Sequence, residues 1–327
     1  AVATPQAFKP ITLPADDGPH QALTEWWYWN GHVAANASAG YSFHLVVCKR
    51  DTKQADGSAR SAYVAHVGIT DHQQKRFVYD QQVLVPPVTE PTLNRFDLQV
   101  GPVRAIGSNG VDKISGTAGD YRIDLALQSL KPPVIHGDAG IVGVSPAESS
   151  YYYSRTRMAA AGTVTVGTTS QTVTGDAWMD HQWGDFGLQG AAGWDWYALQ
   201  LNDGSDVMVS VLRDETGKVI AQYGTWIGAN GEATALKADG LKIDATGQWT
   251  SPATKAVYPM GWRFAVPGQK LDVTLAPVMP DQEMDTTPTT GKVYWEGAVT
   301  VQGARDGKPV TGYGYVELTG YKERTAK

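Results

Sequence analysis

The sequence predicts an all-β protein made of two tandem antiparallel β-barrels, a duplicated unit with few or short helices. Three observations support this prediction. Short runs of alternating or β-branched residues dominate the chain, clusters of Gly, Asn and Asp separate these runs, and the same motifs occur in the same order in both halves. The apolar residues do not recur with the helical period over more than two turns anywhere in the sequence.

Six runs carry the clearest strand pattern, with alternating or β-branched residues. The segments NASAG, ADGS, NDGS, GANGE and ARDGK separate strands and contain the residues that hairpin turns favour. Strands joined in this way pair antiparallel with their neighbours, and many of them in succession indicate a barrel or a sandwich. The six runs are 41–49, 62–70, 162–167, 171–180, 205–213 and 294–301.

The two halves of the chain share motifs. Residues 27–51 and 194–214 both begin with W-x-W, continue through a polar turn into an apolar strand and end in Arg-Asp. Residues 151–180 and 293–317 share an aromatic cluster, a hairpin and the triplet VTG, followed by aromatic residues and an acid. Motifs that recur in the same order indicate a duplicated unit.

The chain has 327 residues, enough for two domains, because single hydrophobic cores rarely grow beyond about 250–300 residues. The Gly-rich segment 184–193 has no periodicity and separates the two copies of the repeat. We therefore expect an N-terminal domain over residues 1–187 and a C-terminal domain over residues 188–327. Residues near this boundary would line a cleft between the domains, a common position for a ligand site.

The composition excludes several classes of function. The formal net charge is −6 and basic residues do not cluster with aromatic ones, so we expect no nucleic-acid partner. No apolar run approaches the ~20 residues of a membrane-spanning helix, so we expect no integral membrane segment. The sequence has no nucleotide-binding motif, so we expect no cofactor. The segment GVSPA only partly matches a nucleophile elbow, and Ser145 is expected to be a loop residue.

The first residues, AVATPQAF, are typical of the segment left after cleavage of a signal peptide. We therefore expect export to the bacterial periplasm or secretion. The single cysteine, Cys48, excludes an internal disulfide and is expected to be a buried thiol. The seven histidines form neither H-x-H nor H-E-x-x-H, so no metal site is expected.

Tryptophans, aspartates and a histidine gather between residues 175 and 201. Strand alternation places His181 and Trp183 on one face of a strand, and Asp195 and Tyr197 on one face of the next. A carboxyl group on an apolar face has a raised pKa and can donate a proton near neutral pH. Asp195 and His181 are therefore the candidate catalytic residues. Alternatively, Asp195 pairs with an arginine or caps a turn.

The repeat separates two kinds of acid. Asp180 is matched by Glu317, so both are expected to be structural because each half has an acid there. Asp195 is matched by Tyr28 in the alignment of the W-x-W segments, so this acid belongs to one half alone. That asymmetry favours a chemical role for Asp195.

The aromatic content exceeds what a β core of this size needs, with 11 Trp, 15 Tyr and 6 Phe. Aromatic faces give an apolar ligand a large contact area at little entropic cost, so we expect an apolar small molecule as the partner. A structural role is the simpler reading for His44, which lies within a strand. The candidate substrate-binding residues are Trp183, Tyr197, Trp27, Tyr28, His44 and Trp194.

Ten segments between about residues 15 and 321, among them EWWYWNGHV, VTGDAWMDHQWG, GWDWYALQLNDG and YWEGAV, follow one another in a recognisable order. They resemble the carotenoid 1,2-hydratase (hydroxyneurosporene synthase) and AttH-like family. The resemblance implies two lipocalin-like β-barrels and, in the carotenoid hydratases, an aspartic acid that protonates an isolated alkene before water captures the cation.

The matching motifs imply roles for specific residues of this chain. The acid would be Asp195, with His181 and Trp183 nearby. Two positions depart from the hydratase pattern: Gln182 replaces a glutamate, and Gly193 precedes the W-D-W motif where a larger aromatic residue is expected.

Two functions follow from these observations. The first is a cofactor-independent enzyme that uses acid to hydrate, isomerise or cyclise an isoprenoid or polyene-like substrate in a cavity of a barrel or between the domains. The second is an exported protein that carries a lipid or other hydrophobic ligand without chemistry, with a functional link to a transporter. The oligomeric state does not follow from the sequence.

Overall fold

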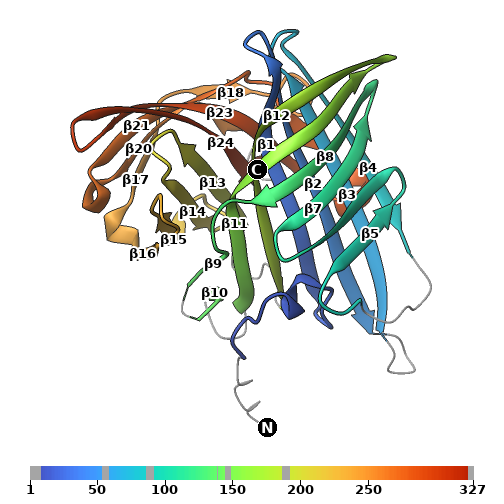
Figure 1. The fold of residues 1–327 in the computed structure, drawn as a ribbon. Helices are drawn as coiled ribbons and strands as arrows, with labels where there is room; N and C mark the ends of the chain where they lie inside the picture. The colour runs from blue at the N-terminus through green and yellow to red at the C-terminus, as the bar shows by residue number, and fades with distance from the viewer. Residues whose placement is uncertain are drawn as a thin grey trace.

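Figure 1 presents the fold as a computed structural model, which describes residues 9–53, 59–85, 92–137, 139–143, 149–185 and 192–322. Nearly all regular structure in these residues is β-strand, so the predicted all-β class is confirmed. No helix among them is long and apolar enough to cross a membrane. The expected domain boundary, the first eight residues and Ser145 lie outside the described residues. The helical segments are η1 (Ala15–Asp17), η3 (Ala238–Gly240), η4 (Pro267–Gln269) and α1 (Thr287–Thr290).

The N-terminal half forms one large antiparallel sheet. Its strands are β1 (Thr24–Asn36), β2 (Ala39–Lys53), β3 (Ala59–Asp71), β4 (Arg76–Leu84), β5 (Phe96–Val100), β6 (Val103–Ser108), β7 (Val111–Ala118), β8 (Tyr121–Ser129), β9 (Val134–Ile135), β10 (Ile141–Gly143), β11 (Ser149–Val166) and β12 (Thr169–Gly184). They pair in the order β4-β3-β2-β1-β12-β11-β8-β7-β6-β5, with β9 and β10 also on β11. The sheet curls until β4 and β5 touch, as in a barrel.

The C-terminal half forms a second large antiparallel sheet. Its strands are β13 (Gly193–Leu201), β14 (Asp206–Arg213), β15 (Val219–Ile227), β16 (Ala233–Leu236), β17 (Lys242–Ala245), β20 (Trp262–Val266), β21 (Leu271–Pro277), β22 (Glu283–Asp285), β23 (Val293–Arg305) and β24 (Lys308–Thr319). They pair in the order β16-β15-β14-β13-β24-β23-β21-β20-β17, with β22 on β23. A separate ribbon pairs β18 (Gln248–Thr250) with β19 (Val257–Pro259).

The two sheets repeat one strand order. The series β3-β2-β1-β12-β11-β8-β7 in the first sheet corresponds to β15-β14-β13-β24-β23-β21-β20 in the second. In each half the first strand therefore lies between its hairpin partner and the last strand of the same half. The duplicated, curled antiparallel architecture confirms the predicted fold class.

The strand register gives the structural alignment of the two halves. Asp180 lies opposite Tyr28 in the first sheet. Its counterpart Glu317 lies opposite Trp196 in the second sheet. Tyr28 therefore corresponds to Trp196.

This register corrects the predicted match between Asp195 and Tyr28 by one residue. Asp195 corresponds instead to Trp27, because it precedes Trp196 as Trp27 precedes Tyr28. The W-x-W motifs had aligned the wrong tryptophans. Since alternate residues of a strand face opposite sides, a slip of one residue exchanges the two faces. Asp195 and Trp27 point into the interior of their own sheets.

Buried apolar side chains form three clusters. One fills the inside of the first sheet, one fills the inside of the second, and the third lies between the two sheets. We call this third layer the seam; the outward faces of β1, β2, β11 and β12 meet those of β13, β14, β23 and β24 there, near the centre of Figure 1. Its buried apolar members are Tyr28, Val142, Tyr152, Trp178, Trp196, Ala198, Met208, Ala298 and Tyr315.

Candidate functional site

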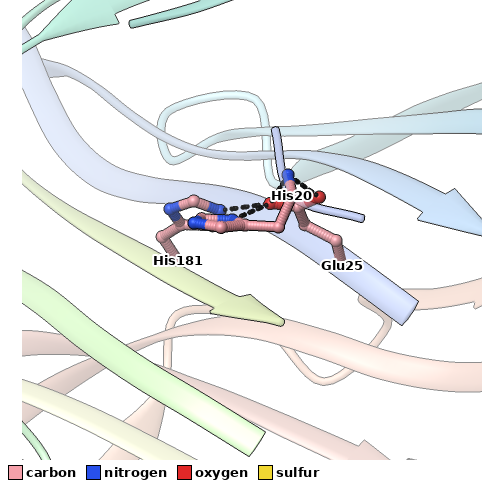
Figure 2. Close-up of side chains that lie close together, drawn as sticks. All are labelled: His20, Glu25 and His181. Carbon is pink, nitrogen blue, oxygen red and sulfur yellow. Dashed lines mark hydrogen bonds and ion pairs between the residues drawn. The ribbon is translucent and has the colours of Figure 1, made fainter. Parts of the chain in front are cut away.

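Titratable side chains converge at one end of the first sheet (Figure 2). The carboxylate of Glu25 accepts two hydrogen bonds through Oε1, from Nδ1 of His20 at 2.7 Å and from Nε2 of His181 at 2.9 Å. Its Oε2 accepts the backbone N–H of His20 at 2.9 Å and lies 3.5 Å from the ammonium of Lys49. Glu25 and His181 are fully buried. We call Glu25, His20, His181 and Lys49 the barrel-end cluster.

Strand pairing explains why these residues meet. Glu25 and Trp27 lie on β1 opposite Trp183 and His181 of β12, and all four face the inside of the sheet. The ring of His20 stacks on Trp183 with centroids 4.0 Å apart, and His181 stacks on Trp27 at 4.6 Å. The predicted common face of His181 and Trp183 is confirmed. The tryptophan rings exclude water from the ion pairs.

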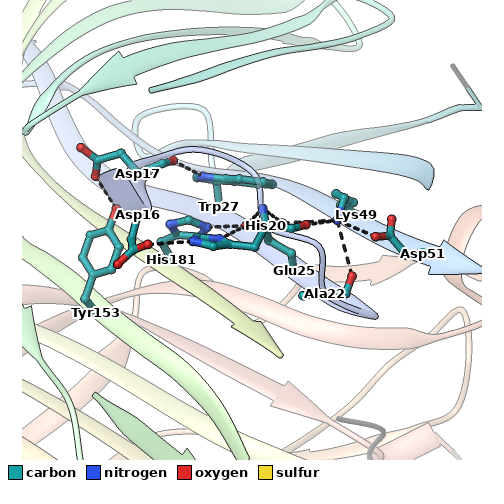
Figure 3. A network of polar contacts seen from close by, with 10 residues as sticks. All are labelled: Asp16, Asp17, His20, Ala22, Glu25, Trp27, Lys49, Asp51, Tyr153 and His181. Atoms are coloured by element: carbon teal, nitrogen blue, oxygen red, sulfur yellow. Dashed lines mark hydrogen bonds and ion pairs between the residues drawn. The ribbon is translucent and has the colours of Figure 1, made fainter. Parts of the chain in front are cut away.

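A wider network holds the cluster in place (Figure 3). Lys49 donates to Asp51 at 3.0 Å and to the carbonyl oxygen of His20 at 2.6 Å. The indole of Trp27 donates to the carbonyl oxygen of Asp17 in η1 at 3.1 Å, and the hydroxyl of Tyr153 donates to the Asp17 carboxylate at 2.5 Å. The segment containing η1 is thereby fastened across the end of the sheet.

The partners of Glu25 decide its charge. Burial raises its pKa, but hydrogen bonds from His181 and His20 outweigh burial and lower the pKa to about 2. Burial lowers the pKa of His181, against the opposing effect of Glu25. Burial also lowers the pKa of His20, but hydrogen bonds to Asp16 and Glu25 outweigh it and raise that pKa. Glu25 is therefore a carboxylate at neutral pH and has little capacity to donate a proton.

The barrel-end cluster is also where described side chains could hold a metal ion. The ligand atoms of His20, Glu25 and His181 lie within 4.8 Å of one another, and two imidazoles with one carboxylate suit zinc. The sequence spacing gave no sign of this set because His20 precedes the first strand. Metal binding would have to displace contacts already made, since Oε1 accepts from both histidines and Lys49 places a positive charge beside Oε2.

Asp195 lies inside the second sheet, whereas His181 lies inside the first. The guanidinium of Arg213 donates to Oδ1 of Asp195 from Nη2 at 2.7 Å and from Nε at 3.2 Å. The hydroxyl of Tyr321 lies 3.1 Å from both carboxylate oxygens. Asp195 thus forms the ion pair with an arginine that was the alternative considered from the sequence. A carboxylate held in this way is poorly suited to donate a proton.

Tyr321 connects Asp195 to the surface. It lines an open groove of about 590 Å³ together with Ala245, Gly247, Val257 and Pro259. The Arg213 guanidinium lies 4.2 Å from the centroid of its ring, and neither Arg213 nor Asp195 lines the groove. A ligand in the groove would therefore meet Tyr321 before Asp195.

The six predicted substrate-binding residues are divided among three places. Two lie inside the first sheet, one lies inside the second, and three face the seam. The roles of these residues stay predictions, but the structure brings only part of the set together. Trp27 and Trp183 lie inside the first sheet, and Tyr197 lies inside the second. The three that face the seam are Tyr28, His44 and Trp194.

Three acids that face the seam form no described ion pair with a lysine or arginine: Asp180, Glu296 and Glu317, which we call the seam acids. A fourth acid on this side, Asp206, is paired with Lys131 and Arg157 of the first half. The hydroxyl of Tyr28 donates across the seam to Oε1 of Glu296 at 2.7 Å. Glu296 and Glu317 lie directly opposite each other on β23 and β24, so their side chains are neighbours on one face. The indole of Trp194 forms a hydrogen bond with Glu317.

Asp180 has more donors than the two glutamates. Its Oδ2 accepts from the hydroxyl of Tyr152 at 2.7 Å, and its Oδ1 accepts from the indole of Trp178 at 2.6 Å. The hydroxyl of Ser154 also donates to Oδ1. These donors stabilise the carboxylate form of Asp180 relative to the other seam acids.

The pKa values of the seam acids move in the opposite direction from that of Glu25. Burial raises the pKa of Glu317 to about 7 and that of Asp180 to about 6. Burial, followed by the charge of Glu317, raises the pKa of Glu296 well above its usual value. Among the described residues, no lysine or arginine contributes to these three shifts. The seam therefore holds carboxyl groups that retain protons near neutral pH.

One edge of the seam is accessible. Glu317 and Trp194 from the second sheet, and Trp26, Val46 and Cys48 from the first, each keep part of their surface exposed. Cys48 was expected to be buried, but the structure leaves part of its surface exposed. Its surroundings nevertheless raise the pKa of the thiol to about 12, chiefly through burial, so the thiol is protonated at neutral pH. A proton-retaining acid thus lies beside apolar and aromatic side chains that solvent can reach.

Sequence reasoning missed the two glutamates of the seam. Asp180 and Glu317 were assigned structural roles because both halves carry an acid there, and Glu296 was seen only as part of the YWEGAV motif. The signal that could have found them is spacing. Glu296 follows Tyr294, and Glu317 follows Tyr315, by two residues, which places each acid on the same strand face as an aromatic ring.

Comparisons with known proteins agree with the architecture. The sequence profile of the AttH-like family matches residues 4–321. Kievitone hydratase of Fusarium solani subsp. phaseoli is 25% identical over 233 residues, which cover 68% of this chain and 65% of that protein. The dehydratase asqC of Emericella nidulans is 24% identical over 217 residues, 63% of this chain and 60% of that protein. The matches therefore span less than two thirds of either relative.

A solved structure from Nitrosomonas europaea, described as an AttH protein, superimposes with a TM-score of 0.86 at 29% identity and covers 98% of this chain and 100% of that chain. Kievitone hydratase from Nectria haematococca gives a TM-score of 0.73 at 18% identity, over 96% of this chain and 94% of that chain. At that identity the second comparison shows a common fold alone.

Proposed function

Because this chain belongs to the AttH-like family, we propose that it is an enzyme that adds water to, or removes water from, an apolar small molecule at the seam. The curated relatives include a hydratase and a dehydratase, which run one chemistry in opposite directions. We assign the proton transfer to the seam acids in place of Asp195 and His181. Asp195 is paired with Arg213, and His181 is bound to Glu25.

One observation carries this proposal: Glu317 is partly exposed, and burial raises its pKa to about 7. A general acid works best when its pKa lies near the operating pH, because it is then both protonated and able to release the proton. Glu25, with a pKa of about 2, has no proton to give.

The chemistry balances without a cofactor. In the hydration direction, Glu317 gives its proton to one carbon of an alkene, so that the π bond breaks and a C–H bond forms. The positive charge on the other carbon lies among the faces of Trp194 and Trp196, which stabilise cations. Water then adds to that carbon, and its spare proton returns to the pair formed by Glu296 and Glu317. Dehydration follows the same steps in reverse.

A carrier function is the second candidate. The partly exposed indoles of Trp26 and Trp194 border an apolar cluster, and this arrangement also suits binding without reaction. A carrier quenches tryptophan fluorescence with a fatty acid or polyene and returns the ligand unchanged. Export, and with it a link to a transporter, stays a prediction from the N-terminal residues.

Turnover with defined probes tests the proposal. The protein is incubated separately with kievitone and with neurosporene, and mass spectrometry follows the gain of one water. We expect water addition to at least one probe, its loss in Glu317→Gln, and its retention in the surface control Glu232→Gln. Unchanged turnover in folded Glu317→Gln would overturn the assignment to the seam. Recovery of both probes unchanged, with saturable fluorescence quenching, favours the carrier.

A further inference from the structure

We propose that His136 is a positioning residue that acts through Ser154 to hold Asp180 as a fixed negative charge in the seam. This inference rests on the proposed function, because a fixed charge assists the reaction only if a cation forms beside it. His136 and Ser154 are fully buried, and neither belongs to the barrel-end cluster or takes part in the proton transfer assigned to Glu317.

His136 directly follows β9 and connects the two halves of the chain. Its backbone N–H donates to the carbonyl oxygen of Tyr152 at 3.1 Å, and its ring packs on the ring of Tyr152 with centroids 4.3 Å apart. Its Nε2 lies 2.6 Å from Oγ of Ser154 on β11, and its Nδ1 lies 2.8 Å from Oγ1 of Thr225 on β15 of the second sheet. Each ring nitrogen therefore has a hydroxyl group as its partner.

The hydrogen bonds of Ser154 fix the tautomer of His136. The Ser154 hydroxyl donates its proton to Oδ1 of Asp180, so the Ser154 oxygen accepts from His136. Nε2 of His136 must then carry the ring proton, and Nδ1 accepts from the hydroxyl of Thr225. Burial lowers the pKa of His136 to about 3, so the ring is neutral at neutral pH. The bonds from Thr225 through His136 and Ser154 are thus all directed toward the carboxylate.

The other two donors of Asp180 point the same way. The indole of Trp178 can only donate, and it lies 2.6 Å from Oδ1. The indole of Trp196 donates to the hydroxyl oxygen of Tyr152 at 3.2 Å, and that hydroxyl donates to Oδ2 of Asp180 at 2.7 Å. A proton on Asp180 would have to displace one of these donors or reverse the chain from His136. Asp180 is therefore ionised at neutral pH, in agreement with its pKa of about 6.

The position of Asp180 suits it to stabilise positive charge in the seam. It lies opposite Tyr28 in the pairing of β1 with β12, and the hydroxyl of Tyr152 joins it to the indole of Trp196. Trp196 in turn lies opposite Glu317, the proposed proton donor. When Glu317 protonates an alkene, the cation forms among aromatic faces with a carboxylate close behind them. A charge that is in place before the reaction stabilises such a cation without reorganisation.

The same bonds would also exist if they only tied β9 and β15 to β11. The tautomer of His136 separates the two roles, because it reports the direction of the bond to Ser154. Nitrogen-15 NMR of protein labelled at histidine distinguishes protonated from unprotonated ring nitrogens, and backbone connectivity assigns the signals of His136. We expect the proton on Nε2 at neutral pH. A proton on Nδ1 would overturn the proposal, since Ser154 would then donate to the ring and Asp180 would be protonated.

Acid should reverse the chain. When Asp180 gains a proton it donates to Ser154, and Ser154 donates to Nε2 of His136. The ring proton is then carried on Nδ1 and donated to Thr225, so the number of protons on the ring stays the same. We expect this change near pH 6, and a ring that keeps its proton on Nε2 while Asp180 titrates would overturn the proposal. The titratable groups that face Asp180 from neighbouring described strands are tyrosines and glutamates, namely Tyr28, Tyr152, Tyr223, Glu296 and Glu317.

The substitution Ser154→Ala removes the link between His136 and Asp180. Because the carboxylate loses a donor, Asp180 should titrate about one pH unit higher, which is about tenfold tighter proton binding, and the acid limb of kcat/KM should move with it. The matched control is Ser150→Ala: Ser150 is buried on the same face of β11, but it accepts from the amide of Gln182 at 2.6 Å. Carbon-13 NMR of protein labelled at the aspartate carboxyl carbons measures the titration. Equal titration of Asp180 in Ser154→Ala and in the wild type would overturn the role of His136.

The two proposals fail separately. A proton on Nδ1 of His136 at neutral pH, together with loss of turnover in Glu317→Gln, overturns the fixed charge alone. A proton on Nε2 and the expected shift of Asp180 in Ser154→Ala, together with full turnover in Glu317→Gln, overturn the function assigned to Glu317 and leave Asp180 as a charge held through His136.

Discussion

The barrel-end cluster and the seam both bury carboxyl groups, and Glu25 and Glu296 are almost equally inaccessible to water. Their partners differ. Glu25 receives two imidazoles and lies beside an ammonium group, and its pKa falls to about 2. Glu296 receives a neutral phenol and faces another acid, and its pKa rises. Burial alone therefore does not assign a role to an acid. The charge of its neighbours decides between an ion pair that holds the fold and a group that stores a proton.

Among the substitutions that test the difference between the two regions, the largest effect is expected on the rate of turnover. Glu317→Gln keeps the shape of the side chain and removes its proton, so the rate of water addition should fall roughly 10²- to 10⁴-fold, the usual contribution of a general acid. The variant should fold as well as the wild type, because Glu317 has no described cationic partner to leave behind. Steady-state rates and urea unfolding measured on the same sample check both statements. A variant that is inactive because it is unfolded would not support the assignment.

Glu25→Gln should have the opposite profile. It breaks a buried ion cluster and leaves Lys49 without its deepest partner, which costs about 3–5 kcal/mol of the free energy of unfolding. Activity per folded molecule should change little. Urea unfolding gives the stability, and the exposed pair formed by Arg263 and Asp272 supplies a control, since Asp272→Asn should cost far less. A loss below ~1 kcal/mol for Glu25→Gln would contradict the structural role of the cluster.

The pH dependence of stability should separate the two regions. The folded pKa of Glu25 is depressed, so its contribution is complete above about pH 4.5 and is lost as the pH falls toward about 2. The folded pKa of Glu317 is raised, so its contribution is complete below about pH 4.5 and is lost as the pH rises to about 7. Each change amounts to roughly 3 kcal/mol at about 1.4 kcal/mol for each pH unit.

Difference curves isolate these contributions, because buried histidines such as His32 also lose stability in acid. Subtracting the unfolding free energy of Glu317→Gln from that of the wild type should leave a decline between pH 4.5 and 7 only. The same subtraction for Glu25→Gln should leave a decline below pH 4.5 only. If both difference curves declined in the same direction of pH, the two carboxyl groups would not differ in the way proposed here.

The smallest effect is expected from Tyr28→Phe. It deletes the hydroxyl that donates to Glu296 and leaves a buried acceptor without that partner, at a cost of about 1–3 kcal/mol in stability. Without this donor the neutral form of Glu296 is favoured further, so the pKa of Glu296 should rise. Infrared detection of the protonated carboxyl band at increasing pH checks the direction. A band that disappears at lower pH than in the wild type would run against the account.

The fold could be predicted from the sequence because the patterns that indicate it involve residues close together in the chain. Alternation predicted correctly that Asp195 shares a face with Tyr197 and that His181 shares a face with Trp183. This prediction needs only neighbouring residues, because side chains two positions apart in a strand point to the same side of the sheet. Matching motifs predicted the duplication. The register of the repeat was predicted wrongly at Asp195, because Trp26 and Trp27 are adjacent and either can be aligned with Trp194.

The site was harder to predict because its contacts join distant parts of the chain. Asp195 could be seen as an acid on an apolar face, but not its partner Arg213, which reaches it through a hairpin. The bond from Tyr28 to Glu296 joins residues 268 positions apart, across the seam between the two halves. No spacing rule within one strand encodes such a contact, so the sequence identified acids without showing which of them have cationic partners.

Site-resolved titration of the carboxyl groups tests the central contrast most directly. Carbon-13 NMR of protein labelled at the glutamate carboxyl carbons, with Glu25→Gln and Glu317→Gln to assign two of the signals, follows each group as the pH changes. We predict that Glu317 titrates near pH 7 while Glu25 remains ionised to about pH 2. A Glu317 signal that titrates below pH 5, together with Glu25 at a similar value, would contradict the account.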